Sequence, residues 1–464
     1  MMELNMMKKA IRCWNRINLE IMLVKNQIIE GKCTDYTYNG LGVVKYDTFC
    51  IFVKDMAINE VGQIKITAVR KDFCYGRLLK IIEPSKQRIE PKCPISKQCG
   101  GCQLQHLSYQ EQLSFKQNHI QNTIDRIAKI DKKVNEVIGC ENPFAYRNKV
   151  ILPVSTDKEG KIIVGFYRYN SNEIIPLEYC FLQSEKANKV VNKLINLFEK
   201  YKLHKDIRYI MLRDMQKTGQ LMLVLVTYQR EVNLKDLVKD IVIFEPTIKS
   251  VIQNINGERT NVILSDESVL LYGSEYIQDN LCGLTFNVSA HSFYQINNFQ
   301  TEVLYNIAIS LADLSKKDTV LDMYCGVGTI GLVLSKYCKE VIGVEIVEKA
   351  VIDARENARI NNIENATFIC GDAEKVSKQL LEEGKQFDCI VIDPPRKGCS
   401  KQTIETLIAL NSEKIVYISC DPSTLARDLF LLKSNYNIEV IQPVDMFPQT
   451  YHVECIAYIQ RKRD

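Results

Sequence analysis

Three glycines with the spacing G-x-G-x-x-G raise the first question about chemistry. Gly326, Gly328 and Gly331 lie in "LDMYCGVGTIGL", after an apolar run typical of a strand and before a helical pattern. Glycines at such a turn let the backbone approach a nucleotide-like ligand closely. The spacing alone fits enzymes that bind nicotinamide, flavin or S-adenosylmethionine (SAM), so residues elsewhere must discriminate among them.

Acidic residues near this turn favour a ligand that carries positive charge. Asp322 lies near the end of the first strand, where a pyrophosphate would face its carboxylate. Two like charges about 4 Å apart repel by roughly 4 kcal/mol at an effective dielectric constant near 20, whereas SAM brings a sulfonium and an ammonium group. Glu345 ends the second strand and suits ribose hydroxyls with either kind of ligand. Asp372, after the third strand, is either close to an adenine ring or a helix N-cap.

The stretch "VIDPPRKG" places an acid and two prolines at the end of a further strand. Amino-group methyltransferases carry a related turn, usually followed by an aromatic residue that stacks on the target base. Here Arg396 follows Asp393, Pro394 and Pro395, which weakens that interpretation. Arg396 and Lys397 are candidates for contacts with a phosphate or a base.

A cysteine and two other ionisable residues lie near the end of the chain. Cys420 follows an apolar strand in "YISCDPSTLARD" and precedes a helix, where a thiolate is favoured. A cysteine in an apolar strand is also an ordinary small core residue, so position alone leaves both roles open. His452 and Glu454 open the last strand in "DMFPQTYHVE", where alternation places them on one face and exposed to solvent.

Cys93, Cys99 and Cys102 form the pattern C-x5-C-x2-C, which indicates a metal site that needs a fourth ligand. The spacing fits zinc and an iron-sulfur cluster about equally. The chain holds 17 cysteines in 464 residues, and that density is typical of a disulfide scaffold only in a short secreted chain. We therefore expect reduced thiols.

The elements that carry these residues predict more than one domain, because a chain of 464 residues with 46% apolar residues exceeds one core. From residue 291 on, apolar strands alternate with helical segments, which predicts an α/β, doubly wound parallel sheet. Short β runs over residues 24–83 predict a five-stranded barrel whose aromatic residues are mostly core. The net charge of +4 permits nucleic acid as a partner without requiring it.

The sequence shows no continuous apolar run long enough for a membrane span or a signal peptide. We therefore expect a cytoplasmic protein with no membrane partner. Residues 1–23 form an N-terminal extension to which we assign no fold.

With "SAHSFYQINN", "LDMYCGVGTIGL", "VIDPPRKG", "YISCDPSTLARD" and "DMFPQTYHVE" in this order, the chain resembles the uracil-C5 RNA methyltransferase family. Upstream, residues 24–83 look like a TRAM domain, an oligonucleotide-binding-like (OB-like) barrel that binds RNA. "CPISKQCGGCQLQHL" looks like the iron-sulfur segment of this family, and "YRNKVILPV" resembles its central domain. The resemblance implies a central α+β iron-sulfur domain over residues 84–290 and a Rossmann-like SAM-dependent methyltransferase domain over residues 291–464.

The resemblance also implies a mechanism. In this family a cysteine thiolate adds to C6 of uracil, C5 takes the methyl group of SAM, a base removes the C5 proton, and elimination leaves 5-methyluridine. Cys420 matches the nucleophile and Glu454 the general base. The SAM pocket is matched by Gln295, Tyr324, Glu345 and Asp393. Asp393 is also placed to polarise the target base.

For the cysteine motif, the resemblance favours a structural [4Fe-4S] cluster over zinc. Cys180 in "LEYCFL" matches the fourth ligand, and Cys140 is the alternative. The target uridine must leave its stack, so we expect single-stranded or looped RNA. The barrel and the cysteine motif together point to the ribosomal branch of the family and to 23S ribosomal RNA, with transfer RNA as the alternative. No protein partner is implied.

Two hypotheses from other classes stand beside this one. A nicotinamide-dependent oxidoreductase would use the same glycines but leaves "DPPRKG" and "SCDPSTLARD" unexplained, and cofactor titration would identify it. A non-catalytic RNA-binding assembly factor would keep the barrel but would not need the nucleophile, the base and the SAM pocket together.

Overall fold

The computed structural model describes residues 23–463 apart from residues 48 and 259. The expected extension, residues 1–23, lies outside the described residues except for Leu23. The chain separates into two compact units. The first holds the described residues up to Glu90 together with His106–Ser108, and the second holds Pro91–Gln105 and the described residues from Tyr109 onward.

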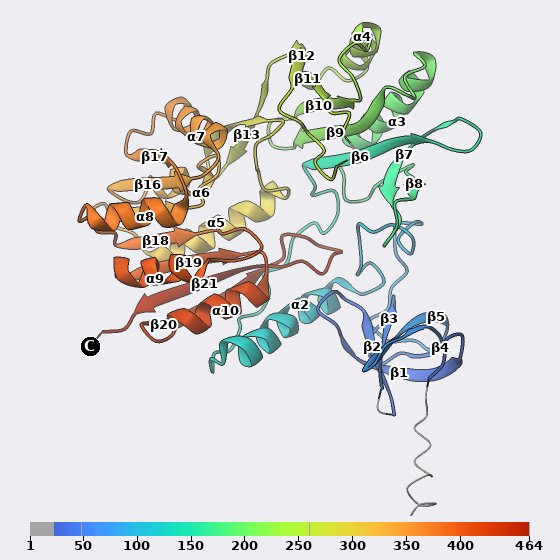
Figure 1. Cartoon of the computed structure of the whole chain (residues 1–464), viewed down its shortest axis with the longest axis horizontal. Helices are drawn as coiled ribbons and strands as arrows, with labels where there is room; N and C mark the ends of the chain where they lie inside the picture. The colour runs from blue at the N-terminus through green and yellow to red at the C-terminus, as the bar shows by residue number, and fades with distance from the viewer. Residues whose placement is uncertain (1–22, 48, 259, 464) are drawn as a thin grey trace, which may run out of the picture. The chain divides into compact units, whose positions relative to one another are not determined.

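The first unit contains a closed five-stranded barrel, which confirms the sequence prediction (Figure 1). The strands follow the order β1-β2-β3-β5-β4. Their bounds are β1 (Ile28–Tyr36), β2 (Gly42–Tyr46), β3 (Phe49–Lys54), β4 (Val61–Val69) and β5 (Phe73–Glu83).

The aromatic residues of the barrel differ from the prediction that most belong to its core. Phe52, Phe73 and Tyr75 lie outside the barrel core and contact one another, with ring centroids 5.2 to 6.0 Å apart. The reason is strand alternation: Ile51 and Cys74 point inward, so the residues beside them point outward. Tyr46 and Phe49 do pack against the core and account for part of the prediction.

A seven-stranded sheet with order β12-β11-β10-β9-β6-β7-β8 forms the central part of the second unit. Only β10 and β11 pair in parallel among its described strands; the other neighbours are antiparallel. Helices α3 and α4 pack their apolar residues against the sheet. The bounds are β6 (Lys149–Thr156), β7 (Ile162–Tyr167), β8 (Ile174–Pro176), α3 (Glu185–Lys200), β9 (Ile207–Met215), β10 (Gln220–Thr227), α4 (Lys235–Phe244), β11 (Ile248–Ile255) and β12 (Ser268–Gly273).

Four further elements lie outside the two large sheets of the second unit. Helix α2 continues into a π-helical turn, η1, and the strands β13 and β14 form an antiparallel pair. Their bounds are α2 (Tyr109–Thr123), η1 (Ile124–Ala128), β13 (Tyr276–Leu281) and β14 (Leu284–Ser289).

The C-terminal part of the second unit is a seven-stranded sheet with helices on both faces, as the alternating pattern predicts (Figure 1). The strand order is β17-β16-β15-β18-β19-β21-β20. The bounds are α5 (Asn298–Ala312), β15 (Thr319–Met323), α6 (Thr329–Leu334), β16 (Glu340–Glu345), α7 (Glu348–Ile360), β17 (Ala366–Cys370), α8 (Ala373–Glu382), β18 (Cys389–Ile392), α9 (Lys401–Leu410), β19 (Lys414–Ser419), α10 (Pro422–Leu432), β20 (Tyr436–Val444) and β21 (Glu454–Arg461).

One strand departs from the predicted all-parallel arrangement. β21 pairs antiparallel with both β19 and β20. No crossover helix separates β20 from β21 along the chain, and strands joined without a crossover pair antiparallel. The sheet therefore has six strands that run in one direction and one reversed strand, β21, inserted between β19 and β20.

Helices α5, α6 and α7 cover one face of this sheet, and α8, α9 and α10 cover the other. Met211 and Met222 of the central sheet belong to the same hydrophobic core as Val320 and Ile456 of the C-terminal sheet. None of the described helices is both long and apolar enough to span a membrane.

Candidate active site

Three of the four predicted SAM-binding residues lie at the carboxyl ends of parallel strands in the C-terminal sheet. Tyr324 follows β15, Glu345 ends β16 and Asp393 follows β18. These strands are neighbours in the sheet, so their ends meet at one edge. Ligands of open α/β sheets bind outside this edge.

The two predicted catalytic residues reach the same edge from opposite directions. Cys420 follows β19, and Glu454 is the first residue of β21. Because β21 runs antiparallel to β19 and Cys455 pairs with Ser419, the start of β21 lies beside the end of β19. The reversed strand thus brings a carboxyl group next to a thiol.

The glycine turn between β15 and α6 is shaped by acidic residues. The amide of Gly326 donates to the carboxylate of Glu345 at 3.1 Å. A Cβ atom on Gly331 would lie 2.6 Å from Oδ2 of Asp322, so this position requires glycine because a carboxyl group packs against it. The third glycine of the motif therefore serves the packing of Asp322, with no ligand needed to explain it.

Asp322 is buried beside the glycine turn. Its side chain is completely buried and lies against Gly331. Burial and the neighbouring Asp393 raise the pKa of Asp322 well above its ordinary value. The carboxyl group packs against Gly331, and the argument from ligand charge stays a prediction.

Three ionisable groups at this edge have raised pKa values: Glu454, Asp393 and Cys420. Burial, followed by the charge of Asp393, raises the pKa of Glu454 well above its ordinary value, and Arg396 opposes this shift. Burial raises the pKa of Asp393 to about 7. Burial and the two carboxyl groups raise the pKa of Cys420 to about 12, again opposed by Arg396. All three groups hold protons more tightly than they would in water.

The expectation that the helix after Cys420 favours its thiolate is wrong for the free protein. Asp421 is the N-cap of α10, and its carboxylate accepts hydrogen bonds from the amides of Ser423 and Thr424 at 2.9 and 3.1 Å. These amides are therefore already occupied, and burial dominates the pKa of Cys420.

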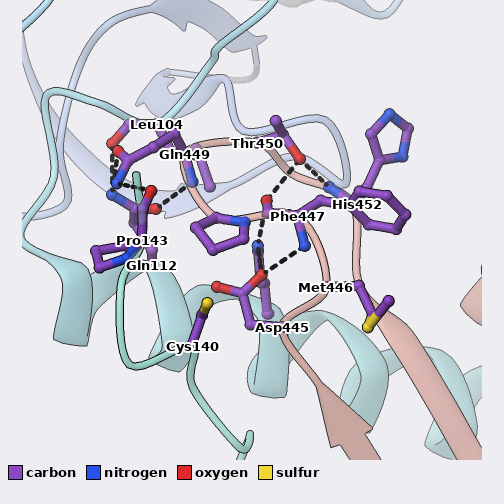
Figure 2. A network of polar contacts seen from close by, with 12 residues as sticks. Leu104, Gln112, Cys140, Pro143, Asp445, Met446, Phe447, Gln449, Thr450 and His452 are labelled. Atoms are coloured by element: carbon purple, nitrogen blue, oxygen red, sulfur yellow. Dashed lines mark hydrogen bonds and ion pairs between the residues drawn. The ribbon is translucent and has the colours of Figure 1, made fainter. Parts of the chain in front are cut away.

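Glu454 and His452 differ from the predicted exposed pair. Glu454 is only 3% exposed, because β21 lies inside a sheet whose two faces are covered. His452 precedes the strand and is half-buried; burial, then Arg396, lowers its pKa to about 4. Its backbone amide donates to the hydroxyl of Thr450 at 3.3 Å (Figure 2).

The loop "DPPRKGC" is held by two residues of α10 to which the sequence assigned no role. Asp428, fully buried, accepts hydrogen bonds from the amide of Cys399 at 2.9 Å and the hydroxyl of Tyr417 at 2.7 Å. Arg427 donates to the carbonyl oxygens of Lys397 and Cys399 at 3.1 and 2.9 Å. The second half of "SCDPSTLARD" thus fixes the loop that starts at Asp393. The motif contained both residues, but their partners lie about a full βαβ unit away in sequence.

Gln295 and Asp372 complete the predicted ligand contacts. Gln295 lies before α5 and is half-buried, and its carbonyl oxygen accepts a hydrogen bond from the side chain of Asn148 at 2.8 Å. Asp372 is the N-cap of α8 and accepts a hydrogen bond from the amide of Lys375 at 3.2 Å. Of the two roles considered for Asp372, the N-cap is the one observed.

The four cysteines predicted to bind a metal line one cavity: Cys93, Cys99, Cys102 and Cys180. The alternative ligand, Cys140, is not among the residues lining it. Burial raises the pKa of Cys102 to about 12, and the charges of Cys180 and Cys99 contribute in the same direction. The thiols are therefore close enough to influence one another.

No group of three or more His, Cys, Asp or Glu side chains is arranged around a single ion in the part of the chain that the structure describes. In an iron-sulfur cluster each cysteine binds a different iron atom, so the sulfurs lie further apart than the ligands of one ion. Gly101 donates its amide to the sulfur of Cys99 at 3.3 Å, and Arg147 also lines the cavity. Amide donors and a cation around the thiols suit a group with thiolate ligands.

Comparison with known proteins identifies the family. Residues 108–462 match the model of the family described as tRNA (uracil-5-)-methyltransferase. An uncharacterized RNA methyltransferase of Clostridium tetani is 45% identical, with 94% of this chain and 97% of that protein covered. A protein of Listeria innocua with the same description is 43% identical, with 95% and 99% covered.

Among solved structures, the chain is similar to the Pyrococcus abyssi tRNA (uracil-54, C5)-methyltransferase in complex with S-adenosyl-L-homocysteine. The TM-score is 0.74 at 27% sequence identity, and the match covers 93% of this chain and 99% of that one. The resemblance inferred from the sequence motifs is thereby confirmed, and the chain belongs to the tRNA (uracil-5-)-methyltransferase family.

Proposed function

We propose that this protein transfers a methyl group from SAM to C5 of a uridine in RNA, through a covalent bond between Cys420 and C6 of the base. The observation that carries the proposal is the meeting of Cys420, Glu454 and Asp393 at one edge of the sheet in a member of this family. Family membership also argues against the nicotinamide and non-catalytic hypotheses.

In this mechanism the chain supplies a nucleophile and a base. The thiol of Cys420 loses its proton to water, its sulfur bonds to C6, and the electron pair of the C5–C6 double bond moves into an enolate, which makes C5 nucleophilic. SAM, when bound, supplies the methyl group for C5. Glu454 then takes the C5 proton, the bond between sulfur and C6 breaks, and Cys420 is restored. Because burial and Asp393 raise the pKa of Glu454, its carboxylate is a stronger base than an exposed glutamate.

We assign SAM binding to Gln295, Tyr324, Glu345 and Asp393. Tyr324 adopts a left-handed backbone conformation with φ +67°, which is rare for a bulky residue and typical of functional sites. Glu345 is oriented by the amides of Gly326 and Val347, at 3.1 and 2.9 Å. A carboxylate held in this way suits the hydroxyl groups of a ribose.

As substrate we propose 23S ribosomal RNA, in the cytoplasm, with the barrel of residues 24–83 contributing to RNA binding. The combination of a barrel with a cysteine motif supports this branch. Transfer RNA is the second candidate, because the similar Pyrococcus abyssi structure is a tRNA methyltransferase. We keep the division into a barrel, a central domain over residues 84–290 and a methyltransferase domain over residues 291–464 as part of the proposal.

We further propose that Cys93, Cys99, Cys102 and Cys180 hold a [4Fe-4S] cluster in the cavity that they line. The spacing of Cys93, Cys99 and Cys102 in sequence, with Cys180 lining the same cavity, supports this assignment. The cluster would link the segment around Cys99 to the turn at Cys180.

The test is incubation with labelled SAM and separated ribosomal and transfer RNA, followed by nucleoside mass spectrometry. We expect label in 5-methyluridine from large-subunit RNA. Cys420→Ala should abolish transfer but still bind SAM, because the thiol acts on the base. Label in another nucleoside, or transfer by Cys420→Ala, contradicts the proposal; label in transfer RNA alone selects the second candidate.

A further inference from the structure

The 445–452 segment joins β20 to β21 and leads directly to Glu454. Asp445, Met446, Gln449 and Thr450 are each at most 3% exposed. A buried connection is unusual, because its polar groups lose water and need partners within the protein. For this segment the partners come from α2 and from the residues that follow Cys102 (Figure 2).

The first anchor is an ion pair between α2 and the start of the segment. Nζ of Lys116 lies 2.5 Å from Oδ1 of Asp445, and both side chains are completely buried. Nζ also donates to the carbonyl oxygen of Phe447 at 3.1 Å, and the hydroxyl of Tyr109 donates to Oδ2 of Asp445 at 2.9 Å. Removing either charge would leave the other buried without its partner.

The second anchor holds Gln449, which has a left-handed backbone with φ +71°. Oε1 of Gln112 accepts the Gln449 amide at 2.9 Å, and Nε2 of Gln112 donates to Oε1 of Gln449 at 3.0 Å (Figure 2). A non-glycine residue keeps this conformation only where its surroundings enforce it. Gln112 therefore fixes a backbone conformation that the segment alone would not favour.

The third anchor comes from the cysteine segment. The amides of Gln103 and Leu104 both donate to the carbonyl oxygen of Gln449 at 3.0 Å. The hydroxyl of Tyr146 donates to the carbonyl oxygen of Pro448 at 3.0 Å. Hydrogen bonds from backbone and side-chain donors thus fix two consecutive residues of the segment, Pro448 and Gln449.

We propose that α2 and Gln103–Leu104 form a clamp on the 445–452 segment, and that Gln112 and Lys116 are positioning residues for proton removal from C5. This inference rests on the proposed role of Glu454. Neither residue touches the substrate; both act by fixing the segment whose end places Glu454 against the base. Displacing a catalytic group by about 1 Å lowers a rate by about 10²-fold.

The test uses two matched glutamine variants of α2. Gln112→Met keeps the size of the side chain and removes its hydrogen bonds to Gln449 and to the carbonyl oxygen of Leu104. Gln117→Met is the control, because Gln117 donates to the carbonyl oxygen of Val134 and has no hydrogen bond to the segment. Lys116→Met is a third variant, but it leaves the Asp445 charge buried and can fail to fold, so the uncharged exchange at Gln112 decides.

We expect Gln112→Met to lower kcat by about 10- to 100-fold with the KM for RNA within about twofold of wild type. A SAM-dependent covalent protein-RNA adduct should accumulate on ordinary RNA, because release needs Glu454. Attack on RNA with 5-fluorouridine at the target, which needs only Cys420, should keep the wild-type rate. Gln117→Met should match wild type in all three measurements.

The clamp is overturned if Gln112→Met has the kcat of wild type. It is also overturned if this variant slows the attack by Cys420 and the release of the product equally. Glu454→Gln is measured in parallel to separate the two proposals. An adduct in Glu454→Gln without one in Gln112→Met overturns the clamp alone. No adduct in either variant overturns the role of Glu454, and the clamp as a device for positioning it.

Discussion

At the scale of single residues, the ionisable groups of the site share raised pKa values. In the proposed mechanism, Cys420 must lose a proton before its sulfur can bond to C6, and Glu454 must be ionised before it can accept one. Burial raises the pKa of both groups, with Arg396 as the cation that opposes each shift. Arg396, which replaces the aromatic residue of amino-group methyltransferases, therefore favours the ionised forms that this chemistry needs.

Glu454→Gln should stop the reaction after methyl transfer. Neither attack by Cys420 nor transfer to C5 uses the Glu454 carboxylate as a base, so only proton removal and release should fail. General-base catalysis contributes about 10² to 10⁴ in rate, or roughly 3 to 5 kcal/mol, so a methylated covalent intermediate should accumulate. A denaturing gel with ordinary RNA should show a slow-migrating, SAM-dependent protein-RNA band.

Cys420→Ala is the control for this band and should show none. Turnover of Glu454→Gln near the wild-type rate, or arrest before any adduct, would mean that Glu454 is not the proton acceptor. His452, or a water held by Asp393, would then be the next candidate.

Asp393→Asn should make the stability of the SAM-free protein less dependent on pH. The folded-state pKa of Asp393 is raised to about 7 from an ordinary 3.8. Its contribution to stability is therefore present below about pH 4 and lost as pH rises through about 7. Relative to wild type, Asp393→Asn should gain about 2 to 4 kcal/mol in unfolding free energy between pH 4 and pH 8.

Urea unfolding at several pH values measures this difference. Asp131→Asn, a change at an exposed residue, is the control and should track wild type at every pH. A constant difference between Asp393→Asn and wild type across this range would show that burial does not shift the pKa of Asp393.

At the scale of elements, helix α10 fixes two separate parts of the site. Its N-cap, Asp421, fixes the backbone directly after Cys420, and Asp428 with Arg427 holds the loop after Asp393. One helix thus sets the distance between the nucleophile and the acid-Pro-Pro turn. This explains why the "DPPRKG" and "STLARD" stretches occur together in one site.

Asp428→Ala should destabilise the protein by about 2 to 4 kcal/mol, because two buried donors, the Cys399 amide and the Tyr417 hydroxyl, lose their acceptor. Methylation should weaken as well, since the loop that starts at Asp393 is released. Denaturant unfolding and methylation rates check both effects. The exposed Glu405→Ala in α9 should change the unfolding free energy by less than about 0.5 kcal/mol; a loss of similar size in both variants would contradict the specific role of Asp428.

The sequence predicted elements wherever their pattern is local. Short β runs separated by turns predicted the barrel, and alternating strands and helices predicted the doubly wound sheet. The burial of Glu454 was missed because alternation within β21 does not reveal that β21 is inserted between β19 and β20. The packing of Asp322 against Gly331 was not predicted either, because position at a strand end does not reveal which residue of the following turn a side chain contacts.

At the scale of the whole molecule, the sequence does not reveal which residues far apart in the chain contact one another. Lys116 and Asp445 are an isolated lysine and aspartate in sequence, and only the fold joins them into a buried pair. The same holds for Gln112 and Gln449. The family motifs point to the proposed reacting residues, but the groups that hold those residues in place show no sequence spacing that a single chain reveals.

The cysteine cavity also joins distant parts of the chain, and its content has a direct test. Cys180→Ser should lose iron and sulfide together, because a cluster left with three thiolates is readily lost, and the thermal unfolding temperature should fall since metal binding is coupled to folding. Cys140→Ser is the matched control: this cysteine is buried but does not line the cavity, so iron and sulfide should remain.

Iron, sulfide and zinc are measured on anaerobically purified protein. Zinc at about one equivalent without iron would select the single-ion alternative. Iron lost from Cys140→Ser but kept in Cys180→Ser would exchange the two cysteines as fourth ligand. Iron lost from neither, with the barrel and the methyltransferase sheet still folded, would mean that the remaining three thiols and another group hold the cluster.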